Sequence, residues 1–215
     1  MKFAQGSLSW ILTTLFMGLF FVILSLIFKE LLGSIFLFIS FVLFLMTILF
    51  LVFFRDPDRI IGKGLVAPAD GKIREIIQFK DDNIGECTKI STFMKLHNVH
   101  VNRMPFDGII KDVVHIDGAH LPAFKKESKR NERVIITANT DIGLIKIIQM
   151  AGTLARRIVP YVKGGDKLKK GDKIGLIRLG SRVDIYLPTK KIKHITVKIN
   201  DRIKAGVDTI AKIND

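Results

Sequence analysis

The pair Gly180-Ser181 is the first feature of the sequence that suggests a chemical role. It interrupts "GLIRLGSRVDIYLP" (residues 175–188), in which apolar residues alternate with polar ones over much of the length and predict a β-strand. Glycine weakens the interior of a strand because it has no side chain to pack and loses much conformational freedom on folding. The pair therefore indicates either a bulge or tight bend, or a peptide bond that itself reacts through the serine hydroxyl.

Asp70, His97 and His100 could activate Ser181 if folding brings the four residues together. An Asp–His–Ser set can orient an imidazole, deprotonate a hydroxyl and so create a nucleophile. Asp70 precedes a glycine in "PADGKI", where a turn alone would explain it. The two histidines of "KLHNVHVNR" would face opposite sides of a strand but would converge on a turn. No Gly-x-Ser-x-Gly elbow surrounds Ser181, which disfavours an ordinary serine hydrolase.

The remaining residues that bind metals or take part in redox chemistry give weaker signals. No cysteine or third histidine lies at ligand spacing from the histidine pair, so we expect no metal site. Cys87 is the single cysteine, which excludes an intrachain disulfide and fits a reducing compartment. His115 and His120 flank a predicted turn, "HIDGAH", and His194 lies among lysines, where we expect a surface position.

Two apolar segments near the N-terminus, residues 8–28 and 35–54, are suited to a lipid environment. Each has about 20 residues, enough for a helix to cross the roughly 30 Å hydrocarbon core of a bilayer. Only a short "KELLGS" link separates them, so residues 1–54 predict a membrane-anchoring, transmembrane helical hairpin. Arg55 and Arg59 follow the second segment, which places the rest of the chain on the cytoplasmic side of the cell membrane. We expect both arginines to meet lipid headgroups at the interface.

Residues 55–215 predict a mainly β catalytic domain. Short runs rich in β-branched residues are separated by glycine-containing turn signals, and no long helical period is present. The segments "VAPADGKI" and "VKGGDKLKKGDKIGLI" resemble the two halves of a barrel-sandwich hybrid, the architecture of lipoyl and biotinyl carriers. This part carries most of the net charge of +14, which fits nucleic acid or an anionic membrane surface. The apolar segments favour the membrane, so we expect a lipid bilayer and no nucleic acid as the partner.

An ordered set of motifs resembles the short-form pyruvoyl-dependent phosphatidylserine decarboxylases, a family that includes archaetidylserine decarboxylases. The set comprises "FFRDPDR", "VAPADGKI", "HNVHVNRMP", "HLPAFKKESKRNER", "QMAGTLARRIVPYV" and "KGDKIGLIRLGSRVDIYLP". It extends over residues 53–188, behind an N-terminal hydrophobic region such as the family often has. Each motif alone is a weak signal, whereas the whole set in this order is specific.

The resemblance implies a proenzyme that cuts its own chain between Gly180 and Ser181. Ser181 would attack the carbonyl of Gly180 and end as a pyruvoyl group at the N-terminus of a fragment of residues 181–215. The fragment of residues 1–180 would stay in the membrane, and the two chains would remain associated. The family resemblance also suggests a homodimer.

The resemblance further assigns roles to the residues that could activate the serine. Asp70 and His100 match the family residues that serve self-cleavage, and His97 matches the histidine associated with decarboxylation. In the family, the pyruvoyl carbonyl forms a Schiff base with the serine amine of the lipid and accepts the electrons released with carbon dioxide. The expected activity is a carbon–carbon lyase that converts phosphatidylserine or archaetidylserine to the ethanolamine lipid, with neither a metal nor pyridoxal phosphate.

Arg156 and Arg157 are candidates for binding the phosphate of the lipid substrate. Guanidinium groups match the geometry of phosphate oxygens, and the pair lies in "GTLARRIV" within one of the family-like motifs. The alternative is that both arginines are surface charges or contact the phosphates of the bilayer.

Two non-catalytic alternatives explain part of the sequence. A membrane-anchored adaptor with a lipoyl-like hybrid domain accounts for "APADGKI" and "KKGDKIG" equally well. It does not account for the joint presence of His97, His100 and the Gly180-Ser181 bond. A carrier domain modified on lysine is the other alternative, and it would need a lysine at a clear hairpin tip flanked by methionines.

Overall fold

The structure of this chain is a computed structural model, and it describes residues 2–118, 131–152, 157–178 and 181–214. Three residues singled out in the sequence, His120, Arg156 and Gly180, lie outside the described residues. The chain divides into two compact units, Met1–Asp58 and Arg59–Asp215. They are called the helical unit and the β unit below.

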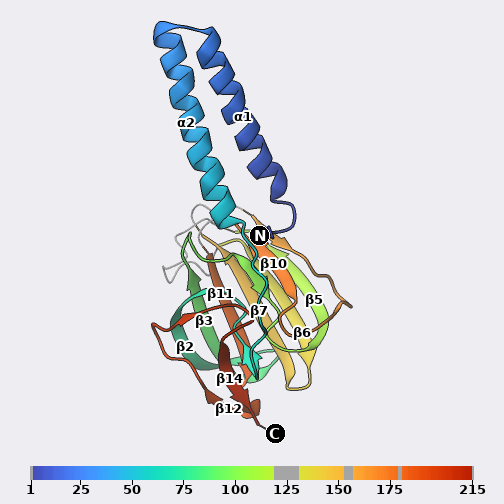
Figure 1. Cartoon of the computed structure of the whole chain (residues 1–215). Coiled ribbons are helices and arrows are strands. Elements are labelled where there is room, and N and C mark those ends of the chain that lie inside the picture. The colour runs from blue at the N-terminus through green and yellow to red at the C-terminus, as the bar shows by residue number, and fades with distance from the viewer. Residues whose placement is uncertain (1, 119–130, 153–156, 179–180, 215) are drawn as a thin grey trace. The chain divides into compact units, whose positions relative to one another are not determined.

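The helical unit is a pair of helices, α1 (Leu8–Ile27) and α2 (Glu30–Phe53), that pack side by side (Figure 1). Small polar residues lie where the helices meet, because they allow close approach and can hydrogen-bond across the contact. The hydroxyl of Ser40 donates to the carbonyl oxygen of Gly18 at 3.0 Å, and the hydroxyls of Thr47 and Thr14 are 2.9 Å apart. Both helices are long and apolar enough to cross a membrane, by length and composition.

The second helix begins earlier than the sequence predicts, at Glu30 instead of residue 35. The "ELLGS" part of the expected link is helical because it contains good helix formers and no proline, and because Glu30 places a negative charge in the first turn. The connection between the helices is therefore only Phe28 and Lys29.

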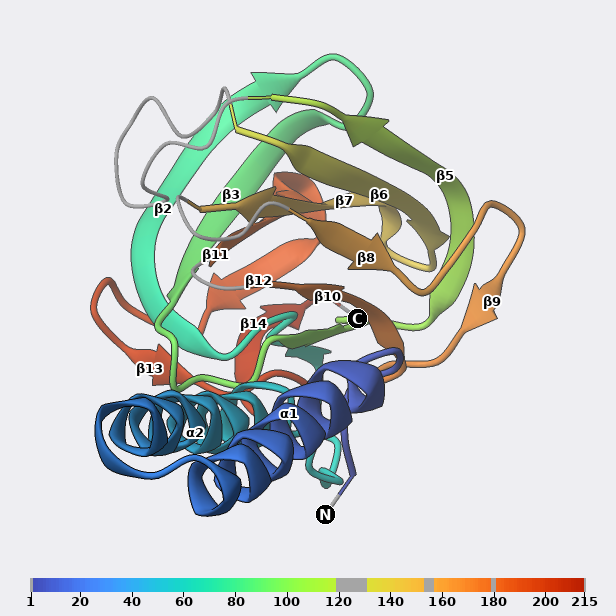
Figure 2. The ribbon, with the colours of Figure 1, turned by 90° about the horizontal axis from the view of Figure 1, so that it is seen from above.

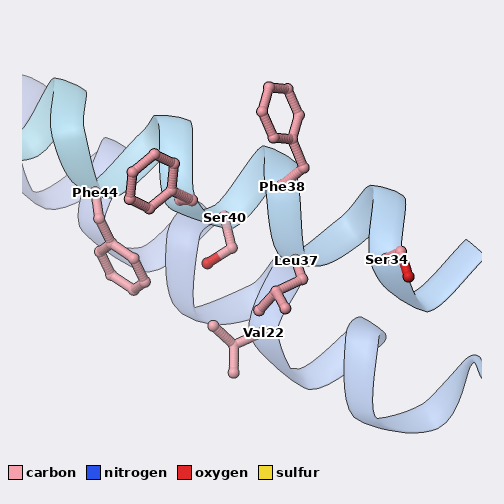
Figure 3. A pocket seen from close by; sticks show the side chains of 7 residues that line it. Val22, Ser34, Leu37, Phe38, Ser40 and Phe44 are labelled. Atoms are coloured by element: carbon pink, nitrogen blue, oxygen red, sulfur yellow. The ribbon is translucent and has the colours of Figure 1, made fainter.

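An apolar groove of about 580 Å³ lies between the two helices (Figure 3). Leu37 of α2 points toward Val22 of α1, whereas Phe38 points away from α1. Phe38 and Phe41 are 66% and 59% exposed. Large apolar side chains exposed to this extent along a helix are unfavourable in water and suit a hydrocarbon environment.

The β unit confirms the predicted mainly β fold. Eight strands form one curled antiparallel sheet in the order β13-β2-β3-β11-β7-β6-β5-β9 (Figure 2), and two three-stranded sheets, β1-β14-β12 and β4-β10-β8, complete it. The strands are β1 (Leu65–Val66), β2 (Gly71–Asp81), β3 (Gly85–Met94), β4 (Val101–Arg103), β5 (Gly108–Ile116), β6 (Arg133–Thr140), β7 (Gly143–Ala151), β8 (Ile158–Pro160), β9 (Lys167–Leu168), β10 (Lys173–Ile177), β11 (Ser181–Pro188), β12 (Ile192–Ile195), β13 (Arg202–Ile203) and β14 (Thr209–Ile213), with a short 3-10 helix at Thr189–Lys191.

The alternation expected for a half-buried strand is clearest in β11. Val183, Ile185 and Leu187 are fully buried in the hydrophobic core, while Arg182 and Asp184 lie on the opposite face of the sheet. The core is formed by such residues from the facing strands, most of them isoleucine and valine. These β-branched side chains pack well on a pleated surface, so the same residues that favour the strands also fill the interior.

Two of the glycine–aspartate turns predicted in "VKGGDKLKKGDKIGLI" form with the same geometry. In the first, the backbone N–H of Lys163 donates to Asp166, and Gly165 has a φ of +92°. In the second, the N–H of Lys169 donates to Asp172. An aspartate that accepts from a backbone N–H three residues earlier, next to a glycine with positive φ, stabilises a tight turn. These turns lead the chain into β10, and β10 leads to Ser181.

Candidate active site

Ser181 is the first residue of β11, a strand in the middle of the eight-stranded sheet. It pairs with Met94 of β3 on one side and with Ala151 of β7 on the other, and it is fully buried. Its hydroxyl donates to the Sδ atom of Met94 at 3.3 Å. Thioether sulfur is a weak acceptor, so this contact orients the hydroxyl without stabilising it strongly.

Asp70 lies at the same end of the sheet as Ser181. Lys72 of β2 pairs with Phe93 of β3, so the preceding residue, Gly71, lies beside Met94. A Cβ atom on Gly71 would collide with the carbonyl oxygen of Phe93, which shows how closely the two backbones approach. Since neighbouring strands are about 4.8 Å apart, the backbones at Gly71 and Ser181 are separated by roughly 10 Å, with Met94 between them.

The two histidines of "HNVHVNR" have different environments because the chain turns between β3 and β4. The backbone N–H of Lys95 donates to the Asn98 side chain at 2.8 Å, and the N–H of Asn98 returns to the carbonyl of Lys95 at 2.9 Å. His97 is exposed on this turn, whereas His100 is fully buried. The carbonyl of His100 accepts a hydrogen bond from the N–H of Ile177 at 3.4 Å, so His100 lies next to the strand that precedes Ser181.

The hydrogen bond of the His100 ring identifies its basic nitrogen. Nδ1 lies 2.8 Å from the carbonyl oxygen of Asn98. A carbonyl oxygen only accepts, so Nδ1 carries the proton when the ring is neutral, and Nε2 holds the lone pair. The turn at Asn98 therefore sets the tautomer and orientation of the imidazole.

Asp70 is held by a different group, the guanidinium of Arg59. The Nη1 and Nη2 atoms of Arg59 donate to the two carboxylate oxygens at 2.6 and 2.9 Å, and the backbone N–H of Ala205 donates to Oδ1 at 2.7 Å. A carboxylate has about four acceptor positions, and these hydrogen bonds from the described residues occupy three of them, two on Oδ1 and one on Oδ2. The pair is fixed in orientation, because the Arg59 and Asp70 side chains are only 7% and 9% exposed.

The expectation that Arg59 meets lipid headgroups is wrong. Besides Asp70, its Nη1 atom donates to the carbonyl of Ala205 at 2.8 Å, so its charge is satisfied inside the β unit. Sequence spacing gave no sign of this contact, because Ala205 comes from a segment far along the chain. Asp70 itself lies at a bend directly before Gly71, the first residue of β2.

Two buried amides next to Ser181 were not predicted from the sequence. Gln149 of β7 donates to the side-chain oxygen of Asn102 at 2.7 Å, and Asn102 lies 3.8 Å from the Met94 sulfur that Ser181 contacts. Both amides are fully buried. A glutamine inside the apolar run "LIKIIQMAG" was the available signal, because buried polar side chains cost free energy unless they are paired.

The other candidate residues are spread over the β unit. Arg157 is exposed immediately before β8, and His194 is exposed on β12, as expected for a surface residue. Cys87 is buried at the opposite end of β3 from Met94. Within the described residues, no three His, Cys, Asp or Glu side chains gather into a group that could hold a metal ion.

A comparison with protein-family models matches residues 46–211 to the phosphatidylserine decarboxylase family. The chain belongs to this family. The match extends over all the elements that surround Ser181, from the end of α2 to β14.

Curated relatives in this family come from bacteria and archaea. The phosphatidylserine decarboxylase proenzyme of Streptomyces avermitilis is 49% identical over 159 residues, which cover 74% of this chain and 71% of the relative. A Methanococcoides burtonii protein named "Putative archaetidylserine decarboxylase proenzyme" is 38% identical over 213 residues, or 97% of this chain and 95% of the relative. A Halobacterium salinarum protein of the same name is 44% identical over 163 residues, covering 74% of this chain and 79% of the relative.

The contact between His100 and Asn98 predicts the protonation of the imidazole. In the full chain carrying Ser181→Ala and labelled with nitrogen-15 in histidine, the neutral His100 ring should carry its proton on Nδ1. The measurement is the pair of ring nitrogen chemical shifts, with exposed His194 as the reference. A neutral His100 with its proton on Nε2 would contradict the assignment.

Proposed function

We propose that this chain is the proenzyme of a membrane-anchored, pyruvoyl-dependent lipid decarboxylase. It would cleave itself between Gly180 and Ser181 and then convert phosphatidylserine or archaetidylserine to the ethanolamine lipid and carbon dioxide. The observation that carries this proposal is the position of Ser181. It is a buried hydroxyl at the start of a central strand, and Asp70 and His100 lie at the same end of the sheet.

Self-cleavage begins with the serine hydroxyl. Ser181 Oγ attacks the carbonyl carbon of Gly180 while Nε2 of His100 accepts the hydroxyl proton, and the C–N bond breaks to leave an ester and a free amine on Ser181. Removal of the Ser181 α-proton then breaks the Cβ–O bond, which releases the Gly180 carboxylate and leaves dehydroalanine. Tautomerisation to an imine and addition of water release ammonia and leave the pyruvoyl group.

Asp70 supports this reaction through its fixed carboxylate. Among the described residues, Oδ2 accepts one hydrogen bond and Oδ1 accepts two, and Asp70 lies at the end of the sheet where the imidazole would acquire positive charge. A negative charge in that position stabilises an imidazolium in a buried site. Asp70 thus acts on the charged form of His100, whereas Asn98 orients the ring.

The surroundings of Ser181 fit a pyruvoyl group at this position. The neighbouring residue on β7 is Ala151, which has a small side chain, and Met94 supplies an adaptable apolar contact. The group supplies a carbonyl that combines with an amine and accepts the electrons released with carbon dioxide. His97 is assigned the return of a proton to the substrate carbon, a role that suits its exposure to water on the turn.

The fragment of residues 181–215 would stay bound after cleavage because of its place in the sheet. β11 pairs with β3 along its whole length and with β7 along most of it, and β14 pairs with β1. Arg59 and Asp70 also contact Ala205 across the two fragments. A homodimer is part of the proposal on the family resemblance alone.

The helical unit would bring the enzyme to its lipid substrate. Its two apolar helices are proposed to cross the bilayer, and the basic residues of the β unit would face anionic headgroups on the cytoplasmic side. A substrate whose acyl or isoprenoid tails stay in the bilayer then needs only its headgroup to reach Ser181.

Substitutions at Ser181 and His97 separate the two reactions. Purified wild-type protein should run as two fragments on a denaturing gel and release carbon dioxide from a serine phospholipid. Ser181→Ala should abolish both self-cleavage and carbon dioxide release, because the precursor of the pyruvoyl group is lost.

His97→Ala should cleave normally, but its rate of carbon dioxide release should fall at least about 100-fold, the usual contribution of a general acid. Uncleaved, folded wild-type protein would overturn the proposal, and normal release by cleaved His97→Ala would overturn the role of His97.

Arg59 should affect cleavage more than decarboxylation. Arg59→Gln removes the fork that fixes Asp70 and should slow self-cleavage at least about tenfold, while carbon dioxide release per pyruvoyl group changes little. Lys146→Gln is the matched control, because Lys146 pairs with Asp81 at the other end of β2 in a similarly buried ion pair. Thermal unfolding of both variants reports lost stability. Equal slowing of cleavage in the two variants would show that Arg59 matters only for folding.

A further inference from the structure

The turn at residues 95–98, called the His97 turn below, presents an apolar side chain on the outside of the β unit. Leu96 is 43% exposed and lies between Lys95 and His97, which are also exposed. The N–H of Lys95 donates to the Asn98 side chain, and the N–H of Asn98 donates to the carbonyl of Lys95. Leu96 is therefore displayed on a hydrogen-bonded turn. A single exposed leucine is common on protein surfaces, so its surroundings decide its meaning.

The His97 turn lies at the end of the sheet that holds Ser181. It directly follows Met94, the last residue of β3, which pairs with Ser181. At its other end, the carbonyl oxygen of Asn98 lies 2.8 Å from Nδ1 of the buried His100 ring. The turn is thus joined on both sides to residues of the candidate active site.

Exposed basic side chains surround this end of the sheet. Arg74 of β2 is exposed, and its guanidinium carbon lies 5.3 Å from the centroid of the Phe93 ring on β3. Lys95 is exposed on the His97 turn itself, and Arg157 is exposed immediately before β8. Basic residues around an apolar side chain are typical of surfaces that bind anionic membranes.

Carboxylates near the same end are largely neutralised within the β unit. Ion pairs join Asp70 to Arg59, Glu75 to Lys89, Asp184 to Arg182 and Glu132 to His115. Asp117 and Asp201 are exposed, but Asp117 lies 3.6 Å from Nε2 of His115 and Asp201 directly precedes the exposed Arg202. Among the described residues, the charge presented around the His97 turn is therefore mainly positive.

We propose that the His97 turn docks onto an anionic lipid bilayer, with Leu96 inserted among the headgroups and Lys95 against their phosphates. This inference rests on the proposed function, because it takes the substrate to be a lipid that stays in the bilayer. Insertion removes the leucine side chain from water, and the lysine adds attraction to the negative surface potential.

The chemistry of the substrate places the turn at this depth. Only one carbon and one oxygen lie between the carbon that loses carbon dioxide and the phosphorus of the headgroup. His97, which is proposed to return a proton to that carbon, therefore works close to the plane of the phosphates. The Cα atom of Leu96 is about 3.8 Å from that of His97, because the two residues are consecutive. Leu96 thus reaches the headgroup region when His97 reaches the substrate.

The first test locates Leu96 relative to the bilayer without catalysis. The full-length chain carrying Ser181→Ala and Leu96→Cys is labelled with a nitrobenzoxadiazole dye and placed in nanodiscs of phosphatidylglycerol and phosphatidylcholine. Lipids with a spin label high on the acyl chain should quench the dye, because it lies at the level of the headgroups. Quenching should decrease in nanodiscs of phosphatidylcholine alone, and also when Lys95→Gln is added.

Ile109→Cys is the matched control for the labelled position. Ile109 is 46% exposed and pairs with Asn139 near the β6–β7 hairpin, at the opposite end of the sheet from Ser181. A dye at this position should stay unquenched. The Ser181→Ala chain without an added cysteine is the blank, because its one thiol, Cys87, is fully buried. Burial also raises the pKa of Cys87, which slows its reaction with the dye.

The second test uses chains that retain Ser181. Leu96→Ser should self-cleave as the wild type does, and its KM for a long-chain serine phospholipid in anionic proteoliposomes should rise at least about fivefold, because the apolar contact with lipid is lost. Its KM for a short-chain, water-soluble serine phospholipid should change less than about twofold. Leu96→Phe should behave as the wild type, because it keeps an apolar side chain at the interface.

Three outcomes would overturn this inference. Equal quenching at positions 96 and 109 would show that the His97 turn does not dock, and equal quenching in anionic and uncharged nanodiscs would remove the role of the anionic surface. An equal rise in KM for the short-chain and long-chain lipids would assign Leu96 to the active site instead. Wild-type protein that never cleaves would overturn the proposed function, whereas the quenching test would keep its meaning because it uses Ser181→Ala protein.

Discussion

The register of β11 between β3 and β7 is the constraint on which the candidate active site depends. Ser181 is the first residue of the strand, and its pairing with Met94 and Ala151 fixes where the preceding peptide bond must lie. Because side chains alternate along a strand, a slip of one residue would move the serine hydroxyl to the opposite face of the sheet. The contact of the hydroxyl with Met94 is therefore a property of strand pairing.

Charged side chains on the outer face of the sheet reinforce this register. Arg182 donates to Asp184 at 2.7 Å and to the hydroxyl of Ser91 at 3.0 Å, and Lys89 lies 2.6 Å from Glu75. Arg182 also lies 3.5 Å from Glu75 of β2, so a shifted register of β11 would separate Arg182 from both Ser91 and Glu75. Arg182, the residue directly after Ser181, is thus held on one face of the sheet, while the Ser181 side chain lies on the other.

The parts of the fold that follow from local chemistry could be predicted from the sequence, and the contacts that join distant segments could not. The helices, the β unit and the Asp166 and Asp172 turns depend on periodicity and on short-range hydrogen bonds. The bonds of Arg59 to Asp70 and of Arg178 to Arg157 depend on topology, which spacing along the chain does not encode. The family motifs brought out Ser181, Asp70, His97 and His100 because they appear in order. Arg59 lay within one of those motifs and was still misplaced, since a basic residue after an apolar helix fits headgroups equally well.

The proposed function depends on one covalent change, the conversion of Ser181 into a pyruvoyl group. The most direct measurement is intact-mass and fragmentation spectrometry of the small chain released when purified, membrane-extracted protein is denatured. We expect a fragment of residues 181–215 in which a pyruvoyl group replaces the N-terminal serine, so that the fragment has a reactive ketone and resists Edman degradation. A folded protein that yields only the intact 24.3 kDa chain with an unmodified serine would contradict it.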